Sequence, residues 1–427
     1  MTIRIALLAL ALALLPAAAA HAAPPSLPVD FEVENANRSA LPCPADGSKR
    51  TVRGRLVLPA GPRPSTVTLY LHEYSFGRFF WDFAAVPGYD YAAALAERGH
   101  ASVIVDRLGY DESDRPVGTA TCLGAHADVA RQIVARLKRQ GFERVVLAGH
   151  SVGAAAAELA AHSFADLGIA GLMVFAWSDR DASQRTVEQS AAQGAVCAGG
   201  GEPADEGGPG GYAYYGQAPE DFQANVFASA EPAVVAAATR MRNRDPCGDA
   251  ASLTQATVVN AGRAERIEVP VLVLFGERDP NFEPGAGPRQ AELFSGSPDV
   301  TLRTFAGASH ALTLEREAPA VQDEAARWLA ARWPRGDAPH APEPPTRARS
   351  CRSRRTIRIT LPRGRRARRI AIAVPGRARR VIRGPRRTIR VDLRGLPRGR
   401  YAVRVSVSYR GGGTVRIIRR YRTCAPR

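Results

Sequence analysis

Short apolar runs alternate with longer amphipathic or alanine-rich stretches over most of the chain. Apolar runs bounded by glycine, proline or charged residues are typical of strands that are buried on both faces of a parallel sheet. The strands predicted in this way are residues 51–58, 66–72, 101–107, 144–148, 169–177, 269–275 and 300–305. The helices predicted between them are residues 89–98, 124–139, 152–164, 289–293 and 319–332. The pattern predicts an α/β fold over residues 24–333, with helices on both faces of a mostly parallel sheet.

Residues 178–266 interrupt this alternation. A connecting loop usually has about six residues, so the segment is far too long to be one. It holds a glycine-rich acidic stretch at 199–211, a group of tyrosines (Tyr212, Tyr214 and Tyr215) and a helical pattern at 232–241. We expect an inserted cap over an active site. The alternative is a disordered surface insertion, which the glycine content would also suit.

The pattern changes after a proline-rich linker at residues 334–346. Apolar and arginine residues then alternate with a period of two, as in Ile357, Ile359 and Leu361. This alternation is typical of antiparallel strands with one buried face. Residues 347–427 are therefore predicted to form a small arginine-rich β-sandwich, with Cys351 and Cys424 joined by a disulfide.

The first 23 residues are typical of a secretory signal peptide. Arg4 precedes an apolar core at 5–15, and an Ala-x-Ala pattern ends at Ala22. The sequence thus predicts an exported protein, secreted or associated with the cell envelope. Six cysteines fit disulfides in that setting. Besides the pair in the tail, we expect Cys197 with Cys247 and Cys43 with Cys122, and no zinc site, since no metal-ligand spacing is present.

The net charge of +17 divides unevenly along the chain. Residues 346–427 contain 28 arginines, no lysine and one acid, Asp392, which makes this part +27 and leaves the remainder at −10. Two readings of the arginines differ in function. They could bind anionic wall polymers, lipid headgroups or extracellular DNA, or they could reflect genome composition on a solvated face that only stabilises the rest of the protein. Contact with the acidic body is a third possibility, and the scarcity of aromatic residues argues against specific nucleic-acid recognition.

Gly149-His150-Ser151-Val152-Gly153 is the strongest local motif. It follows a predicted strand and precedes a predicted helix, which is where a serine nucleophile stands on a tight turn with small neighbours. A serine nucleophile needs a base, and the base needs a carboxylate that orients it. Asp279 and His310 each follow a later strand, and the order Ser151, Asp279, His310 fits this architecture.

Other residues compete for these roles. Glu277 and Asp179 also lie just after strands and are alternative acids. His126 is an alternative base, although we interpret it as a satisfied surface histidine because it begins a helix before the nucleophile. The oxyanion hole is expected to use the backbone N–H groups of Val152 and Tyr74. His72 is predicted to brace this loop.

With these motifs in order, residues from about 51 to 333 resemble α/β-hydrolases, specifically exported actinobacterial-type members. The resemblance rests on LHEYSFGRFFWDF, PGYDYAAALAERGHASVIVDRLGYDES, GHSVG, VPVLVLFGERD and GASH. It implies the same triad and oxyanion residues, and no metal or organic cofactor. Two departures are Glu73, where these enzymes have the glycine of a His-Gly pair, and Asp111, where DRxGxGxS has its second glycine. We expect the Glu73 side chain to point away from the site and to alter only the loop.

Together these features predict a serine hydrolase that cleaves a small-molecule ester, lactone or thioester through an acyl-enzyme, with amides and peptides less favoured. A serine at the nucleophile position argues against the epoxide-hydrolase and dehalogenase branches, which use aspartate there. The contrasting hypothesis is a catalytically weak protein that acts as a binding protein through its arginine-rich tail.

Overall fold

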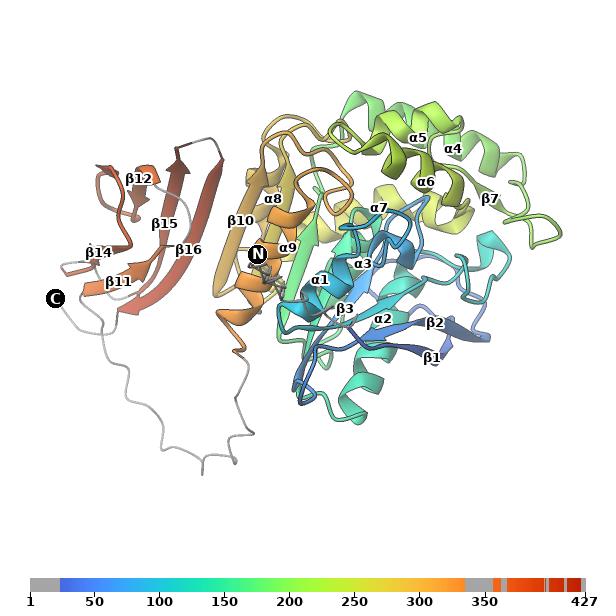
Figure 1. Cartoon of the computed structure of the whole chain (residues 1–427), viewed down its shortest axis with the longest axis horizontal. Helices are drawn as coiled ribbons and strands as arrows, with labels where there is room; N and C mark the ends of the chain where they lie inside the picture. Colours follow the sequence, from blue (N-terminus) through green and yellow to red (C-terminus); the bar gives the residue numbers. More distant parts are fainter. Residues whose placement is uncertain are drawn as a thin grey trace, which may run out of the picture.

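One mixed sheet runs through the protein. The computed structural model describes residues 24–334, 356–361, 367–394, 396, 399–410 and 413–423. Eight strands lie in the order β1-β2-β4-β3-β5-β6-β9-β10. β1 and β10 lie toward opposite sides of the view in Figure 1. β1 and β2 pair antiparallel, as do β2 and β4, and the later neighbours are all parallel. These strands are β1 Ser26–Glu34, β2 Lys49–Val57, β3 Thr66–Leu71, β4 Ala101–Val105, β5 Arg144–His150, β6 Gly171–Phe175, β9 Val271–Gly276 and β10 Asp299–Phe305.

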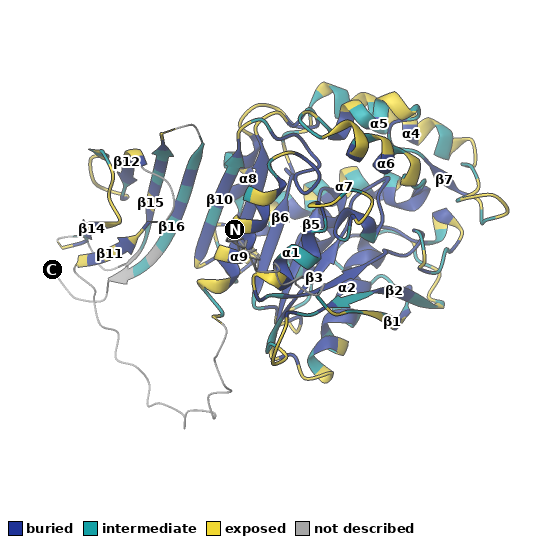
Figure 2. Cartoon of the chain, viewed as in Figure 1, coloured by how far each residue is buried: buried dark blue, intermediate teal, exposed yellow. Residues whose placement is uncertain are grey.

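Helices cover both faces of this sheet because both faces are apolar. Successive side chains of a strand point to opposite faces, and in the central strands β3, β4, β5, β6 and β9 both sets are buried (Figure 2). On β5, for example, Leu147 belongs to one apolar core and Val146 to the other. The covering helices are α1 Tyr91–Glu97, α2 Leu123–Arg139, α3 Val152–Ser163, α8 Ala286–Leu293 and α9 Ala318–Ala330. The predicted α/β fold is thereby confirmed.

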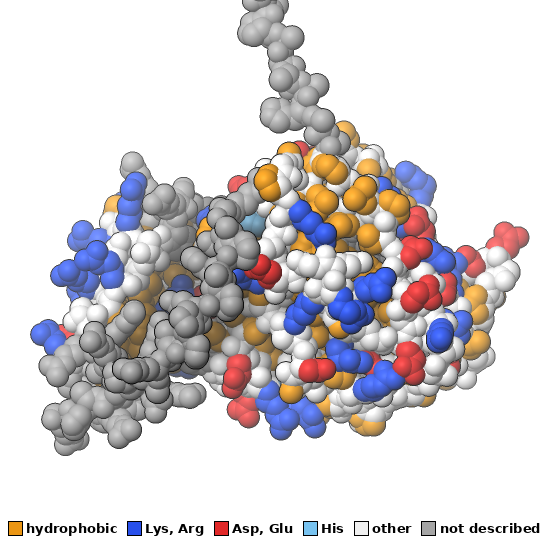
Figure 3. Space-filling view, turned by 90° about the horizontal axis from the view of Figure 1, so that it is seen from below, with side chains coloured by type: hydrophobic (Ala, Val, Ile, Leu, Met, Phe, Trp, Pro, Cys, Tyr) orange, Lys and Arg blue, Asp and Glu red, His pale blue; other side chains and the backbone are white. Residues whose placement is uncertain are grey.

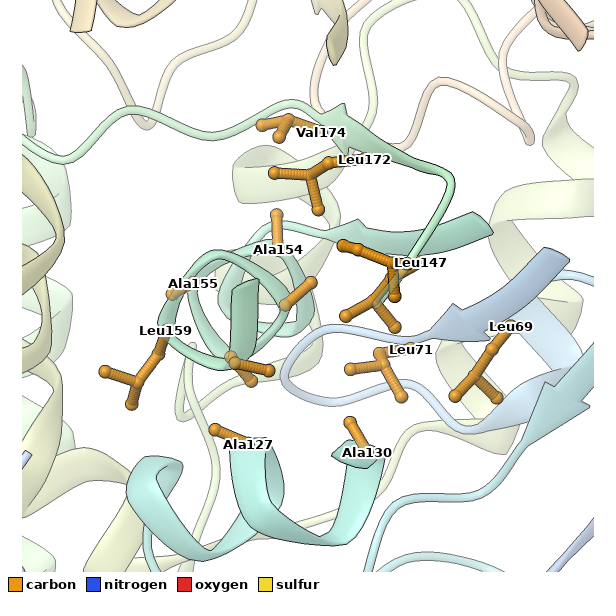
Figure 4. Packing of buried hydrophobic residues seen from close by; sticks show 14 of the residues in the cluster. Leu69, Leu71, Ala127, Ala130, Leu147, Ala154, Ala155, Leu159, Leu172 and Val174 are labelled. Carbon is orange, nitrogen blue, oxygen red and sulfur yellow. The ribbon is translucent and has the colours of Figure 1, made fainter. Parts of the chain in front are cut away.

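Helix α3, which begins just after Ser151, is packed on all sides. Figure 4 shows Ala154, Ala155 and Leu159 of this helix among side chains of the neighbouring strands and of α2. Alanine side chains let the helix approach its neighbours closely, and their contacts hold its first turn firmly. The N-terminus of α3 is therefore a rigid support for whatever chemistry Ser151 performs.

The long insertion is folded. It forms α4 Gln184–Ala198, α5 Pro219–Val226, α6 Pro232–Met241 and α7 Cys247–Arg263, with a two-stranded pair of β7 Tyr212–Ala213 and β8 Asp245–Pro246. A disulfide between Cys197 and Cys247 ties the end of α4 to the start of α7. A second disulfide joins Cys43 to Cys122. Both pairings agree with the prediction, and the alternative of a disordered insertion is wrong.

The arginine-rich tail continues the main sheet. Its strands β16, β15, β12 and β13 extend the sheet beyond β10, and β16 pairs antiparallel with β10 from Asp299–Arg419 to Arg303–Val415. A separate pair, β11 with β14, shares an apolar core with these strands that includes Ile359, Ile389 and Val405. The bounds are β11 Thr356–Thr360, β12 Ala367–Ala373, β13 Arg380–Arg383, β14 Thr388–Asp392, β15 Gly399–Tyr409 and β16 Thr414–Thr423.

Two tail arginines contact acids in the main body of the protein, residues 24–334. Arg419 forms an ion pair with Asp299, and Arg416 lies 3.9 Å from Glu292. The third possibility given above for the arginines, contact with the acidic body, is therefore observed for Arg416 and Arg419. Arginines of β11, β12, β13 and β14 are exposed, and blue side chains gather on the left of Figure 3, where the tail lies.

Several predictions fall outside the described residues. They are the signal segment 1–23, residues 335–346 of the linker, and the pairing of Cys351 with Cys424. In the part of the chain that the structure describes, no helix combines the length and the apolar character needed to span a membrane.

Candidate active site

Ser151 lies on a strained turn between β5 and α3. Its backbone has φ 50° and ψ −120°, a conformation that residues with a side chain rarely adopt. The flanking glycines are required by space. A Cβ atom on Gly149 would lie 2.2 Å from the carbonyl oxygen of Gly153, and one on Gly153 would lie 2.5 Å from that of His72. The GxSxG spacing therefore reflects the close approach of two backbone segments at this turn.

Asp279 and His310 come together from the loops after β9 and β10. Nδ1 of His310 donates a hydrogen bond of 2.8 Å to Oδ2 of Asp279, and both side chains are buried. The backbone N–H of Asn281 donates to the other oxygen of Asp279 over 3.0 Å, which holds the carboxylate in place. Burial opposes a charge on His310, but Asp279 and Glu73 raise its pKa to about 10.

Glu73 points into the site, so the prediction that it points away is wrong. Its Oε2 atom lies 2.9 Å from Nε2 of His310, and its Oε1 atom lies 3.3 Å from Nδ1 of His150. Among the described residues, no hydrogen bond joins the Ser151 side chain to His310. The physical reason for the error is that two buried histidines, His150 and His310, provide polar contacts for this carboxyl group inside the site. The carboxyl group therefore does not have to turn to solvent. His150 beside the serine was the one signal in the sequence that such a partner was present.

The competing residues have other partners. Asp179 accepts hydrogen bonds from Trp177 Nε1 over 2.9 Å and from Gln290 over 2.8 Å. Glu277 is exposed. His126 is buried and lies 2.9 Å from Asp249, so the prediction of a surface histidine is wrong: α2 packs against the insertion, which supplies that acid.

The loop after β3 is braced in the predicted way. Nδ1 of His72 lies 2.7 Å from the carbonyl oxygen of Glu73, and the backbone N–H of Arg107 donates to its Nε2 over 2.9 Å. Burial is the largest cause that lowers the pKa of His72 well below its ordinary value, which agrees with a neutral bracing residue. Asp111, the second departure, has φ 38° and accepts a hydrogen bond of 2.9 Å from Asn243 of the insertion.

A cavity of about 460 Å³ opens beside Ser151 and His310. Tyr74 and Val152 lie on its wall, together with residues of α4 and α7 such as Val187 and Leu253. The inserted segment thus forms part of the cavity wall. Most of the lining is apolar or uncharged, and its charged side chains besides His310 are Glu73, Asp179 and Arg180.

Glu73, His150 and His310 also form the one group, among the described residues, whose potential metal-binding atoms lie within 4.8 Å of one another. The contact between Glu73 and His310 is a hydrogen bond. A shared proton therefore explains why these two side chains lie close together, and no metal ion is needed. We interpret the group as an acid-base cluster.

A serine held at positive φ between a central parallel strand and a buried helix, with an acid-histidine pair after the next strands, defines the nucleophile-elbow class of α/β enzymes. The model for the alpha/beta hydrolase family matches residues 69–325, which is more than half of the chain, so the protein belongs to this family. A comparison with curated proteins found no match.

Solved structures with a similar fold include a thermophilic esterase from Thermogutta terrifontis. It has 18% sequence identity and a TM-score of 0.52, and the alignment covers 71% of this chain and 99% of that one. A monoacylglycerol lipase from Paleococcus ferrophilus has 16% identity and a TM-score of 0.46, with 72% and 99% covered. At such identities the likeness concerns the fold alone.

Proposed function

We propose that the protein hydrolyses carboxylic esters, with Ser151 as nucleophile, His310 as general base and Asp279 as the acid that orients the imidazole. One observation carries the proposal. A buried serine at φ 50° and a histidine hydrogen-bonded to a carboxylate face one cavity. A strained backbone at such a position is typical of a residue that is held for chemistry.

In this mechanism, Ser151 attacks the ester carbonyl while Nε2 of His310 takes the hydroxyl proton. The proton then passes to the leaving alcohol, and water releases the acid from the acyl-enzyme by the same steps. The N–H groups of Val152 and Tyr74 stabilise the oxyanion. Val152 is the first residue of α3, so its N–H has no acceptor within the helix, and the helix dipole favours negative charge there.

The cavity supports an uncharged substrate of moderate size. Its volume of about 460 Å³ and its mostly apolar wall suit an apolar acyl group, and lactones or thioesters of similar size fit the same chemistry.

Replacement of the serine hydroxyl tests the assignment. We expect Ser151→Ala to reduce hydrolysis of p-nitrophenyl butyrate by at least about 10³-fold and to abolish labelling by a fluorophosphonate probe. Ser163→Ala is the matched control, because this serine ends α3 and bonds to the backbone N–H of Ala40 instead. Unchanged hydrolysis or labelling in Ser151→Ala would contradict the proposal.

We further propose that the protein is exported. The two disulfides support this, since disulfides persist mainly in oxidising compartments. Intact-mass analysis of protein from the native secretion route should give a chain that begins near Ala23. A mass that corresponds to the full chain from Met1 would refute export by this signal.

The exposed arginines support a second role, the binding of an anionic membrane surface of the cell envelope. Arg358 and Arg390 lie on the exposed face of β11 and β14, and Arg368 and Arg369 line a hollow of about 800 Å³ on β12. We expect the protein to bind anionic vesicles in a salt-dependent way, and Arg368→Ser with Arg369→Ser to weaken this binding. Equal, salt-independent recovery with neutral vesicles would refute the role.

A further inference from the structure

The carboxyl group of Glu73 lies between the two histidines of the site. It is 2.9 Å from Nε2 of His310 through Oε2, and 3.3 Å from Nδ1 of His150 through Oε1. The three side chains are at most 5% exposed. A third acid-base group is therefore placed against the very atom that has to take the proton of Ser151.

The outer nitrogens of both rings are already committed. Nε2 of His150 lies 2.9 Å from the carbonyl oxygen of His310, and because a carbonyl can only accept, this nitrogen carries a hydrogen. Nδ1 of His310 donates to Asp279 over 2.8 Å. The inner nitrogens, Nδ1 of His150 and Nε2 of His310, both face Glu73.

The two inner contacts differ in character. The contact with His310 is a hydrogen bond, whereas Oε1 of Glu73 and Nδ1 of His150 are buried atoms without a hydrogen-bond partner. Burial lowers the pKa of His150 to about 4, so this ring is neutral and its Nδ1 presents a lone pair. Between the two histidines, Glu73 therefore has one donor, the proton on Nε2 of His310.

Three titratable groups face His310 from three different parts of the fold. Asp279 faces it from the loop after β9, Glu73 from the loop after β3, and His150 from the end of β5. Tyr215 of the insertion lies across the cavity, near Glu73 and Asp279. The carboxylates of Asp279 and Glu73 both favour the charged form of His310, and the neutral ring of His150 adds no opposing charge.

We propose that Glu73 is a positioning residue that holds His310 in its protonated form at rest, so that hydrolysis starts only after Nε2 has released this proton to solvent. The inference rests on the proposed function of Ser151 and His310. Once the proton has left, Glu73 faces two lone pairs and has no donor between the histidines. A buried carboxylate without a donor is unfavourable, so it moves aside, and Nε2 becomes free to accept the Ser151 proton.

A pH–rate profile of Glu73→Gln tests the proposal. Glutamine keeps the shape of the side chain and removes its charge. We expect the acidic limb of kcat to move down by about one to two pH units, which raises activity at pH 7 roughly 10- to 100-fold over the wild type. Glu277→Gln is the matched control, because it removes an exposed carboxylate two residues before Asp279 and should leave the limb in place.

A second measurement separates this inference from the proposed function. NMR of ¹⁵N-labelled histidine in Ser151→Ala reports the titration of His310 without any turnover, and Glu73→Gln in that background should lower its midpoint. Loss of hydrolysis in Ser151→Ala tests the nucleophile alone. The role of Glu73 is refuted if Glu73→Gln changes neither the acidic limb of the kcat profile nor the midpoint of the His310 titration. It is also refuted by a stoichiometric metal whose removal by EDTA shifts the profile, because a cation would then join the three side chains.

Discussion

A buried pair of carboxyl groups under the cavity makes a testable contribution to stability. Glu158 of α3 is fully buried, and Gln290 donates to both of its oxygens over 3.1 Å and to Asp179 over 2.8 Å. Burial, followed by the charge of Asp179, raises the pKa of Glu158 well above its ordinary value. Glu158 is thus protonated in the folded protein and donates its proton toward Asp179.

The sign of the pH dependence follows from this. A carboxyl group whose pKa is raised on folding stabilises the protein fully below its unfolded pKa, and this stability is lost as the pH rises toward the folded value. For one proton, the loss is about 1.4 kcal/mol per pH unit within that window. Above about pH 5.5, where the unfolded glutamate is ionised, the free energy of unfolding should therefore fall with rising pH because of Glu158.

Glu158→Gln removes the titration and keeps the hydrogen bonds, since its amide can donate to Asp179 and its carbonyl can accept from Gln290. We expect urea unfolding at about pH 5.5 and at about pH 7.5 to show a smaller decrease in the free energy of unfolding for Glu158→Gln than for the wild type. Glu188→Gln, which changes an exposed glutamate of α4, should retain the wild-type decrease. Parallel pH dependence in the wild type and Glu158→Gln would refute the reasoning.

Two further predictions concern the elbow and the insertion. Gly153→Ala should destabilise the fold by at least about 1 to 3 kcal/mol, because the new methyl group meets backbone oxygens of Leu71 and His72 within 2.6 Å, whereas Gly194→Ala in α4 has open space and should be neutral or stabilising. Thermal unfolding compares the two, and equal melting temperatures would contradict the close approach. Removing the Cys197–Cys247 disulfide, which closes a separation of 50 residues, should cost roughly 4 kcal/mol in the chain-entropy model. Urea unfolding of Cys197→Ala with Cys247→Ala measures it, and an unchanged midpoint would show that the insertion is held by its other contacts.

Buried parallel strands were predictable because each is a continuous apolar run, as in β5 and β9. β1, in contrast, was not predicted. Only Phe31 and Val33 of this strand are buried, and the other residues, apolar Leu27 among them, are exposed or half-exposed. An edge strand that alternates weakly has little hydrophobic signal, and its pairing with β2 is decided by tertiary structure.

In the tail, too, some features could be predicted from the sequence and others could not. Its period-two alternation predicted strands and an apolar face, both of which the structure has. That β16 would pair with β10 could not be predicted, because pairing between strands depends on backbone hydrogen bonds that carry no side-chain pattern. The ion pair of Arg419 with Asp299 lies at this junction, yet one arginine among 28 gave no sign of its partner.

The position of Glu73 is the most consequential feature that was predicted wrongly from the sequence. Motif spacing predicts the positions of backbone turns: Ser151 and His310 line one cavity, and Asp279 is hydrogen-bonded to His310. It does not decide where a side chain points when its partner is 237 residues away, as His310 is from Glu73. A carboxylate in an oxyanion loop would be expected to turn to solvent, where its charge is stabilised. Here a protonated histidine offers the same stabilisation inside the site, so the residue that departs from the motif becomes part of the acid-base chemistry.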